Sequence, residues 1–442
     1  KVLYRIDIEE TYANIALREA ISQYTLNNLD RSLMTELVYG TTRSCNTIDW
    51  FLNKLLPKGV QKITPWIRNI LRLGVFQLYY LDKIPASAAV NECVKLAKKY
   101  GHPGTVKLVN AVLRNFERKK QEFEFPDLLQ KPVAHISLKY SHPEWMVESW
   151  IKQFGVEATI QLCLANNKPA ANSIRTNTLK ISRENLYKEL QETGLNCEKS
   201  TFTPEGLIID GFNSLTNLAA FKEGRFILQD EASMLVAHIV APKQQDFVID
   251  ACAAPGTKTT HLAQLKSDKS HILACDIYEH KIELINENCR RLNLKSIETK
   301  LLDARKIGNN YFGQADCLLV DAPCSGLGVL RRRPDSRWKK TPDKIRELKK
   351  LQLEILQGAC NCLKSGGILV YSTCSISPEE NIDVIREFLN TNTGFKRDNL
   401  VKYLPFTLER QEDISSAGNG YIQLYPHIHG TDGFFVARLI KA

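Results

Sequence analysis

Two cysteine residues each stand just after an apolar run that has the pattern of a buried strand. Residues 321–326 read DAPCSG and contain Cys324, and residues 372–375 read STCS and contain Cys374. A lone cysteine is most often a small buried hydrophobic residue. Two thiols at strand ends, one of them close to Asp321, instead favour covalent catalysis, in which a thiolate bonds to the substrate and divides one difficult step into easier ones.

Carbon 5 of a cytosine ring is a reaction centre that suits these side chains. That carbon is a poor nucleophile while the ring is aromatic. A thiolate that adds to carbon 6 breaks the aromaticity, so that carbon 5 can attack a sulfonium methyl group. An acidic group near N3 assists the addition by neutralising the developing charge, and Asp321 is placed for this work. On local chemistry alone, either Cys324 or Cys374 could be the attacking thiolate.

A turn of small residues follows an earlier apolar run, residues 247–251. A turn of this kind lets the backbone approach a ligand closely, and ligands of open α/β sheets bind at the carboxyl ends of the strands. The turn is neither a GxGxxG nor a GxxxxGK[ST] motif, which weakens a dinucleotide or triphosphate interpretation. It consists of Cys252, Ala253, Ala254, Pro255, Gly256, Thr257 and Lys258.

Two acidic residues end the next two predicted strands. Asp276 comes twenty residues after Gly256, a spacing that places an acid to accept the hydroxyls of a ribose. Asp303, in the segment LLDAR, could accept the amino group of an adenine. Each aspartate alone could be only a helix cap. With the small-residue turn, however, they describe a pocket for S-adenosylmethionine.

As a set, these motifs resemble those of the Nop2/Sun family of RNA cytosine-5 methyltransferases. The resemblance implies that Cys374 is the nucleophile and that Cys324 assists release of the methylated product. It also implies that residues 252–258, with Asp276, Asp303 and Asp321, bind the cofactor. Thr257 stands where the family more often has glycine, and a threonine still permits a tight turn.

The helical N-terminal part, which contains NAVLRN at residues 110–115, is similar to the NusB-like RNA-binding domain. A NusB-like domain joined to a Sun-type domain implies that the substrate is small-subunit (16S) ribosomal RNA. Three further segments fit the same family: SHPEW at 141–145, RTN at 175–177 and QDEAS at 229–233.

A cluster of cations follows the DAPCSG motif and could hold RNA phosphates. The candidates for RNA contact are Arg331, Arg332, Arg333, Arg337 and Lys339, with Arg175 as a weaker one that could equally pack within the middle module. Trp338 could stack on a base or pack internally. The target cytosine must be unstacked to reach a thiolate, so we expect a loop or a locally opened RNA as substrate.

Hydrophobic periodicity predicts three domains around these motifs. Residues 1–125 show helical spacing punctuated by prolines, which predicts an all-helical domain. Residues 126–235 predict helices followed by a small α+β, RRM-like module that binds RNA. Residues 236–442 alternate strand and helix, which predicts a Rossmann-like class I methyltransferase domain with a mostly parallel sheet of seven strands.

Charge and cysteine usage narrow the class of protein further. The net charge is +10, and residues 1–125 hold 19 Lys and Arg against 12 Asp and Glu, which favours a polyanionic partner. None of the 12 cysteines shows CxxC spacing, so we predict no zinc site and a reducing compartment. No apolar run is long enough to span a membrane, and the visible start lacks the apolar core of a secretory signal. We therefore expect a cytoplasmic protein, and because nothing in the sequence suggests an obligate oligomer, we expect a monomer.

Two classes of alternative function stay open at this point: a cytosine methyltransferase with another nucleic acid as substrate, and a non-catalytic factor. A DNA cytosine-5 methyltransferase would use Cys324 as nucleophile, and a tRNA enzyme would share the chemistry; the basic helical domain and the Thr-Cys motif disfavour DNA. A non-catalytic ribosome-assembly or antitermination-like factor would depend on the N-terminal domain alone. The intact cysteine pair and the full set of cofactor residues argue against that second reading.

Overall fold

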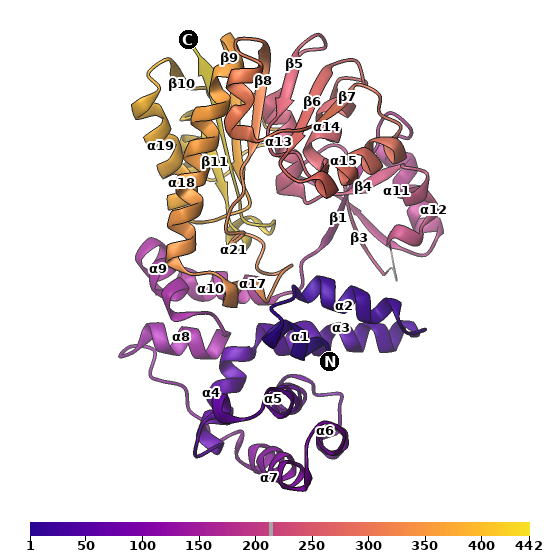
Figure 1. Cartoon of the computed structure of the whole chain (residues 1–442), viewed down its shortest axis with the longest axis vertical. Helices are drawn as coiled ribbons and strands as arrows, with labels where there is room; N and C mark the ends of the chain where they lie inside the picture. The colour runs from indigo at the N-terminus through magenta and orange to yellow at the C-terminus, as the bar shows by residue number, and fades with distance from the viewer. Residues whose placement is uncertain (212–214) are drawn as a thin grey trace. The chain divides into compact units, whose positions relative to one another are not determined.

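The computed structural model describes residues 1–211 and 215–442 (Figure 1). They form two compact units, one of residues 1–169 with 330–340, and one of residues 170–329 with 341–442. The middle domain expected at residues 126–235 is therefore divided: its helices belong to the first unit and its strands to the second. The segment 330–340 also joins the first unit, although it follows the DAPCSG motif directly.

The described residues of the first unit contain only helices, which confirms the all-helical expectation for the N-terminal part. Pro65 and Pro103 occupy the first turns of two helices, where a missing N–H costs nothing. The helices are α1 (Val2–Ile8), α2 (Ala13–Ser22), α3 (Asn28–Arg43), α4 (Cys45–Leu55), η1 (Val60–Lys62), α5 (Pro65–Tyr80), α6 (Ala86–Tyr100), α7 (Pro103–Lys119), α8 (Pro132–Tyr140), α9 (Glu144–Phe154), α10 (Val156–Asn167) and the short α17 (Ser336–Lys339).

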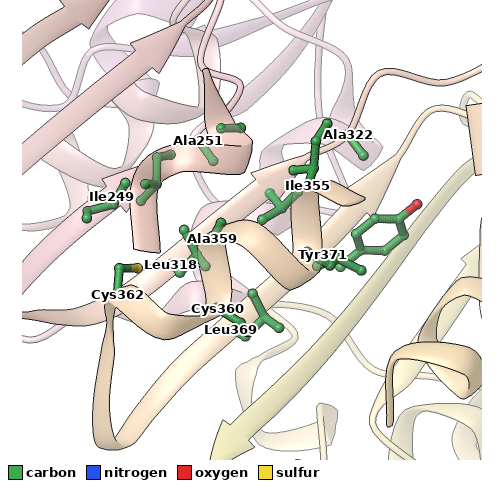
Figure 2. Packing of buried hydrophobic residues seen from close by; sticks show 14 of the residues in the cluster. Ile249, Ala251, Leu318, Ala322, Ile355, Ala359, Cys360, Cys362, Leu369 and Tyr371 are labelled. Carbon is green, nitrogen blue, oxygen red and sulfur yellow. The ribbon is translucent and has the colours of Figure 1, made fainter. Parts of the chain in front are cut away.

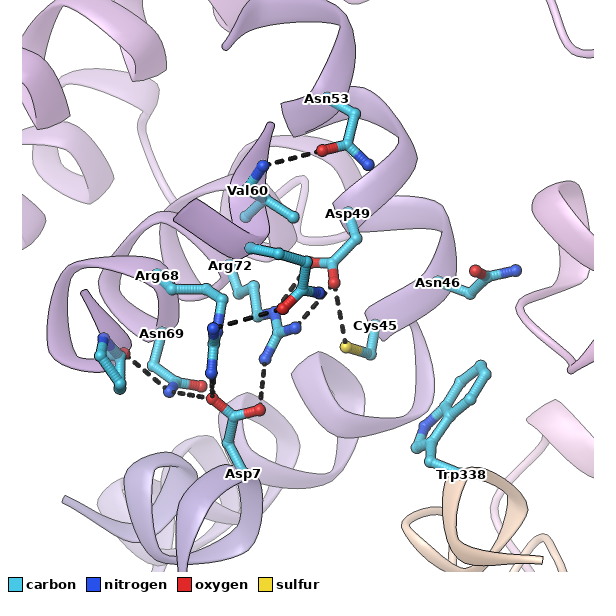
Figure 3. Close-up of polar contacts among 12 residues, drawn as sticks. Asp7, Cys45, Asn46, Asp49, Asn53, Val60, Arg68, Asn69, Arg72 and Trp338 are labelled. Carbon is cyan, nitrogen blue, oxygen red and sulfur yellow. Dashed lines mark hydrogen bonds and ion pairs between the residues drawn. The ribbon is translucent and has the colours of Figure 1, made fainter. Parts of the chain in front are cut away.

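A buried ion cluster ties α1 and α4 to α5 (Figure 3). Arg72 donates to Asp49 at 2.7 Å and to Asp7 at 3.0 Å, and Arg68 donates to Asp7 at 2.7 Å. Burial alone would raise the pKa of Asp7, but the two guanidinium groups and Asn69 outweigh it and lower that pKa. The charges are thus paired and hydrogen-bonded, as buried charges must be.

The second unit begins with a four-stranded antiparallel sheet in the order β2-β3-β1-β4. Its strands are β1 (Asn172–Thr176), β2 (Asn196–Lys199), β3 (Gly206–Asp210) and β4 (Phe226–Leu228), accompanied by α11 (Arg183–Glu192) and α12 (Ala219–Lys222). This is the small α+β arrangement that the sequence predicts.

A larger sheet of eight strands follows in the order β10-β12-β9-β8-β5-β6-β7, with β11 paired to β12. β7, β6, β5, β8 and β9 run parallel to one another, whereas β12 pairs antiparallel with β9, β10 and β11. The sheet has one strand more than expected. The strands are β5 (Phe247–Asp250), β6 (His271–Asp276), β7 (Ile297–Leu301), β8 (Ala315–Asp321), β9 (Leu363–Thr373), β10 (Phe395–Arg397), β11 (Tyr421–Leu424) and β12 (Phe434–Lys441).

Helices cover both faces of the large sheet, which explains why its central strands are continuous apolar runs. Leu318 and Tyr371 pack with α18 and α19 on one face (Figure 2), whereas Leu319 and Val370 pack with α13 and α14 on the other. The helices are α13 (Glu231–Val240), α14 (Thr257–Leu265), α15 (Glu279–Leu292), α16 (Ile307–Asn310), α18 (Pro342–Ala359), α19 (Ile382–Thr391), α20 (Gln411–Gly418) and α21 (Pro426–His429).

The strand order reverses at β5, because the chain runs outward through β6 and β7 and then returns to place β8 on the other side of β5. In open α/β sheets such a reversal opens a crevice at the carboxyl ends of the strands, where ligands bind. The small-residue turn follows β5, and the DAPCSG motif begins at the end of β8. In the described parts of the chain, no helix is both long and apolar enough to cross a membrane.

Candidate active site

The two cysteines of the predicted motifs lie side by side. β8 and β9 are parallel neighbours with Asp321 opposite Ser372, so both motifs leave the sheet at the same edge. The Sγ atoms of Cys324 and Cys374 are 3.3 Å apart, and both residues are half-buried. One small substrate ring could therefore contact both thiols.

Asp321 lies in a hydrogen-bonded pair with a lysine of the small-residue turn. The Nζ atom of Lys258 donates to Asp321 at 2.7 Å, and the hydroxyl of Ser372 donates to the other carboxylate oxygen at 2.8 Å. Burial alone would lower the pKa of Lys258, but the Asp321 carboxylate outweighs it, so that this pKa is raised. Lys258 is therefore a buried cation, and its charge also interacts with the sulfur of Cys374.

The Cys324 thiol is held in its protonated form. The neighbouring Cys374 sulfur, followed by burial, raises the pKa of Cys324 well above its ordinary range. A neutral S–H group at this position can donate to the Cys374 sulfur. The charge of Lys258 acts on the sulfur of Cys374, and the pKa of Cys324 is raised chiefly by that neighbouring sulfur.

The turn after β5 is shaped by one glycine. Gly256 caps α14 with φ +92°, a left-handed conformation that side chains disfavour. A Cβ atom there would also come within 3.2 Å of Ile285. The backbone of the turn is fixed further by the N–H of Ala253, which donates to the Cys275 carbonyl at 2.9 Å. The turn thus offers backbone at close range, which fits a ligand seated against it.

Asp276 is the last residue of β6. Asp303 follows β7 and comes directly before a 3-10 turn. Asp276 is buried and accepts from the N–H of Tyr278 at 3.3 Å. Asp303 is one-quarter exposed, caps its turn through the N–H of Arg305 and pairs with the Arg305 guanidinium at 2.8 Å. Both carboxylates lie at the carboxyl ends of the strands. Asp303 also caps a helical turn, which is the purely structural role considered for it in the sequence.

Arg175, one of the residues predicted to contact RNA, is fully buried. Its guanidinium donates to Gln264 at 3.1 Å, to the carbonyl of Thr257 at 2.6 Å and to the hydroxyl of Thr260 at 3.0 Å. Burial lowers the pKa of Arg175 to about 9. The RNA contact expected here is corrected: Arg175 fastens β1 to the first turn of α14, because buried carbonyls and amides use its donors.

Arg337 requires the same correction. It is fully buried in the first unit and donates to the carbonyls of Ser141 and Asn166, at 2.9 and 3.2 Å, and to the Asn167 side chain at 2.9 Å. Trp338 is half-buried and donates its indole N–H to the carbonyl of Thr42 at 2.8 Å, so it packs internally.

The other cations of this segment differ in exposure. The Nζ atom of Lys339 donates to the carbonyl of Glu10 at 2.7 Å and pairs with Asp335 at 3.3 Å, so its charge is engaged within the unit. Arg331 and Arg332 are half-buried, and Arg333 is exposed. RNA contact by these three arginines stays a prediction, for which Arg333 has the most suitable position.

One group of described residues has the donor types of a metal site. The Nε2 atoms of His238 and His261 lie 3.0 and 2.8 Å from a Glu205 oxygen. Burial, followed by the charge of Arg175, lowers the pKa of His261 to about 3, so this imidazole is neutral. The buried guanidinium balances the Glu205 charge and opposes a further cation. Of the two imidazoles, His238 is hydrogen-bonded to Glu205 at 3.0 Å, and the buried Arg175 charge disfavours a metal ion in this group.

Sequence reasoning missed two buried carboxylates near the motifs. Burial raises the pKa of Asp250 to about 7, and Thr259 donates to it at 2.6 Å. Glu380 lies within hydrogen-bonding distance of both cysteine loops. The only signal for Glu380 was a pair of glutamates shortly after Cys374, and the sequence does not tell which of the two faces inward.

Comparison with known proteins places the chain. Residues 237–440 match a family model described as 16S rRNA methyltransferase RsmB/F. A probable ribosomal RNA small subunit methyltransferase B of Bacillus subtilis is 37% identical over 444 residues, which is 100% of this chain and 97% of the relative. The chain belongs to the RsmB/F family of 16S rRNA methyltransferases. It is thus an rRNA methyltransferase by family.

Two further family models match earlier parts of this family member. Residues 1–118 match the NusB family, and residues 142–216 match the RsmF/B-like ferredoxin-like domain. The ribosomal RNA small subunit methyltransferase B of Serratia proteamaculans is 33% identical over 95% of the chain and 92% of the relative.

Solved structures agree on the architecture. PH0851 has a TM-score of 0.84 at 30% identity and covers 100% of this chain and 97% of its own. NSun6 from Pyrococcus horikoshii, solved with SFG, has a TM-score of 0.61 at 29% identity and covers 68% of this chain and 98% of its own.

Proposed function

We propose that this enzyme transfers the methyl group of S-adenosylmethionine to carbon 5 of a cytosine in 16S rRNA, with Cys374 as the nucleophile. The observation that carries the proposal is the pair of thiols, 3.3 Å apart, beside the hydrogen-bonded Lys258 and Asp321. Family membership supports rRNA as the class of substrate.

The cofactor would lie against the turn at residues 252–258, with Asp276 toward the ribose and Asp303 toward the adenine. The glycine cradle at Gly256 and the carboxylates at successive strand ends fit such a ligand. S-adenosylmethionine supplies an electrophilic methyl group on a sulfonium. No triphosphate motif competes for the same turn.

The side chains divide the remaining work. The Cys374 sulfur forms a bond to carbon 6, which makes carbon 5 nucleophilic. Asp321 accepts a hydrogen bond from the Lys258 ammonium, so this carboxylate is placed to pass a proton from Lys258 to N3 of the ring as charge develops there. After methylation a solvent water takes the proton from carbon 5, the electrons of that bond restore the double bond between carbons 5 and 6, and the Cys374 sulfur leaves carbon 6 as a thiolate. Cys324, adjacent to the reacting sulfur, is the group placed to assist this release.

Labelled S-adenosylmethionine incubated with unmethylated 16S rRNA tests the proposal. We expect label in 5-methylcytosine at one site of the RNA, and none in DNA or tRNA treated in parallel. Label found in another nucleoside would overturn the cytosine assignment. Label in DNA or tRNA alone would overturn the substrate class.

A further inference from the structure

Glu380 places one carboxylate between the two loops that carry the thiols. It ends the 3-10 helix Pro378–Glu380 and is fully buried. The backbone N–H of Ser325 donates to its Oε1 atom at 2.7 Å, and the hydroxyls of Ser325 and Ser375 both donate to its Oε2 atom, the latter at 2.6 Å. Gln352 of α18 also donates to Oε1, at 3.2 Å.

The serines held by this carboxylate are the immediate neighbours of the two cysteines. Ser325 follows Cys324 and Ser375 follows Cys374, and the two hydroxyl oxygens are 3.1 Å apart. A charged acceptor forms stronger hydrogen bonds than a neutral one. A single side chain therefore fixes the chain directly after each thiol, and the 3.3 Å separation of the sulfurs accompanies this arrangement.

The neighbouring Asn381 serves only one of the loops. Its side chain accepts from Thr373 at 2.5 Å and donates to the carbonyl of Ser375 at 2.9 Å. It also donates to Gln423 at 2.7 Å. Asn381 thus supports the Cys374 loop, whereas the Glu380 carboxylate binds both loops.

We propose that Glu380 is a positioning residue that holds Cys324 and Cys374 at the separation needed for both to act on one substrate ring. The nature of that ring rests on the function proposed above, but the holding of the thiols does not. The hydrogen-bond partners of Glu380 among the described residues are Ser325, Ser375, Gln352, Tyr371 and Ser377. None belongs to the turn at 252–258, so the effect of Glu380 falls on turnover rather than on cofactor binding.

The charge of Glu380 supports this role. The carboxylate adds to the effects of Cys374 and of burial that raise the pKa of Cys324. Replacing the carboxylate by an amide removes that contribution while nearly preserving the shape of the side chain. Alkylation of Cys324 should then begin at lower pH, a change that loss of a purely structural contact would not produce.

Glu380→Gln and its neighbour Glu379→Gln form a matched pair of variants. Glu379 is exposed and accepts a hydrogen bond from Ser377 only within its own loop. Mild oxidation with diamide, followed by peptide mapping, measures how fast the Cys324–Cys374 disulfide forms and needs no RNA. Small misplacements of reacting groups have large effects on rate. We therefore expect the rate of disulfide formation and kcat to fall about tenfold or more in Glu380→Gln. The KM for RNA should change less than about twofold. Glu379→Gln should match the parent.

Unchanged disulfide formation and an unchanged pH profile of Cys324 alkylation in folded Glu380→Gln would overturn the proposal. Should that variant fail to fold, Ser325→Ala/Ser375→Ala removes the two hydroxyl donors and keeps the carboxylate. Slower disulfide formation in this double variant supports the positioning role, and parent-like formation overturns it. The two proposals can fail separately. If the parent enzyme methylates no cytosine but Glu380→Gln still slows disulfide formation, the positioning role holds and only the proposed function is rejected.

Discussion

Lys258 connects two motifs that lie 63 residues apart in the sequence, because its ammonium donates to Asp321. The spacing of strand ends identified both residues, since parallel strands deliver their final residues to one edge. The spacing of strand ends did not identify Asp250 or Glu380 as residues near the site. A sequence shows that residues 379 and 380 are both glutamates, but which one is buried depends on packing around the loop.

Lys258→Met tests the role of the hydrogen bond between Lys258 and Asp321. Loss of the proton source at Asp321 should lower methyl transfer by about 100-fold. It should also lower the free energy of unfolding by about 3 kcal/mol, because it leaves a partly buried carboxylate unpaired. Lys258→Met/Asp321→Asn should regain most of that stability without regaining activity, as measured by denaturant unfolding and by labelled methyl transfer. Parent-like activity in the single variant would exclude this role for Lys258.

The loop that carries Cys324 packs against two other loops at Gly328. The carbonyl of Gly328 accepts from the N–H of Gly433, and the N–H of Gly328 donates to the carbonyl of Cys374. The alternation of strands and helices in residues 236–442 predicted the order of the elements and the mostly parallel sheet. It did not predict this packing of one loop against another, since a glycine in a loop has no periodic signal.

Gly328→Ala tests that contact at the scale of elements. A Cβ atom at Gly328 would lie 1.9 Å from the carbonyl oxygen of Gly433 and 2.8 Å from that of Cys374. We expect the clash to lower stability by about 2 kcal/mol and methyl transfer by about tenfold or more. Gly394→Ala, where a Cβ atom meets nothing within 4 Å, is the control and should behave like the parent. Thermal unfolding and initial rates give both quantities, and equal behaviour of the two variants would refute the packing argument.

Many hydrogen bonds join residues that are far apart in the sequence. Such contacts are the part of the structure that is hardest to predict from the sequence. Arg337 bonds to a carbonyl 196 residues away, within the first unit. From the sequence, Arg337 and Arg333 were equivalent members of one basic segment and both were predicted to contact RNA. Burial separates them, because the fold encloses Arg337 and leaves Arg333 exposed. The family and the fold class were predictable from local motifs, whereas the division into two units was not.

Arg337→Leu and Arg333→Ala test the distinction at this scale. The first should lower the free energy of unfolding by about 3 kcal/mol, because it leaves buried carbonyls without donors. Arg333→Ala should leave stability unchanged and weaken RNA binding. The slope of log binding constant against log salt concentration should fall by the amount that corresponds to about one phosphate contact. Titrations of RNA at several salt concentrations and denaturant unfolding measure both. An RNA-binding defect in folded Arg337→Leu equal to that of Arg333→Ala would restore the original assignment of Arg337.

We propose that Cys374 attacks the substrate and that Cys324 assists its release. The most direct measurement incubates Cys324→Ala with S-adenosylmethionine and 16S rRNA, separates protein from RNA under denaturing conditions and maps any covalent complex. We expect a stable complex joined through Cys374, and neither complex nor methyl transfer in Cys374→Ala or in the double variant. Methyl transfer by Cys374→Ala at the parent rate, or a complex joined through another residue, would contradict it.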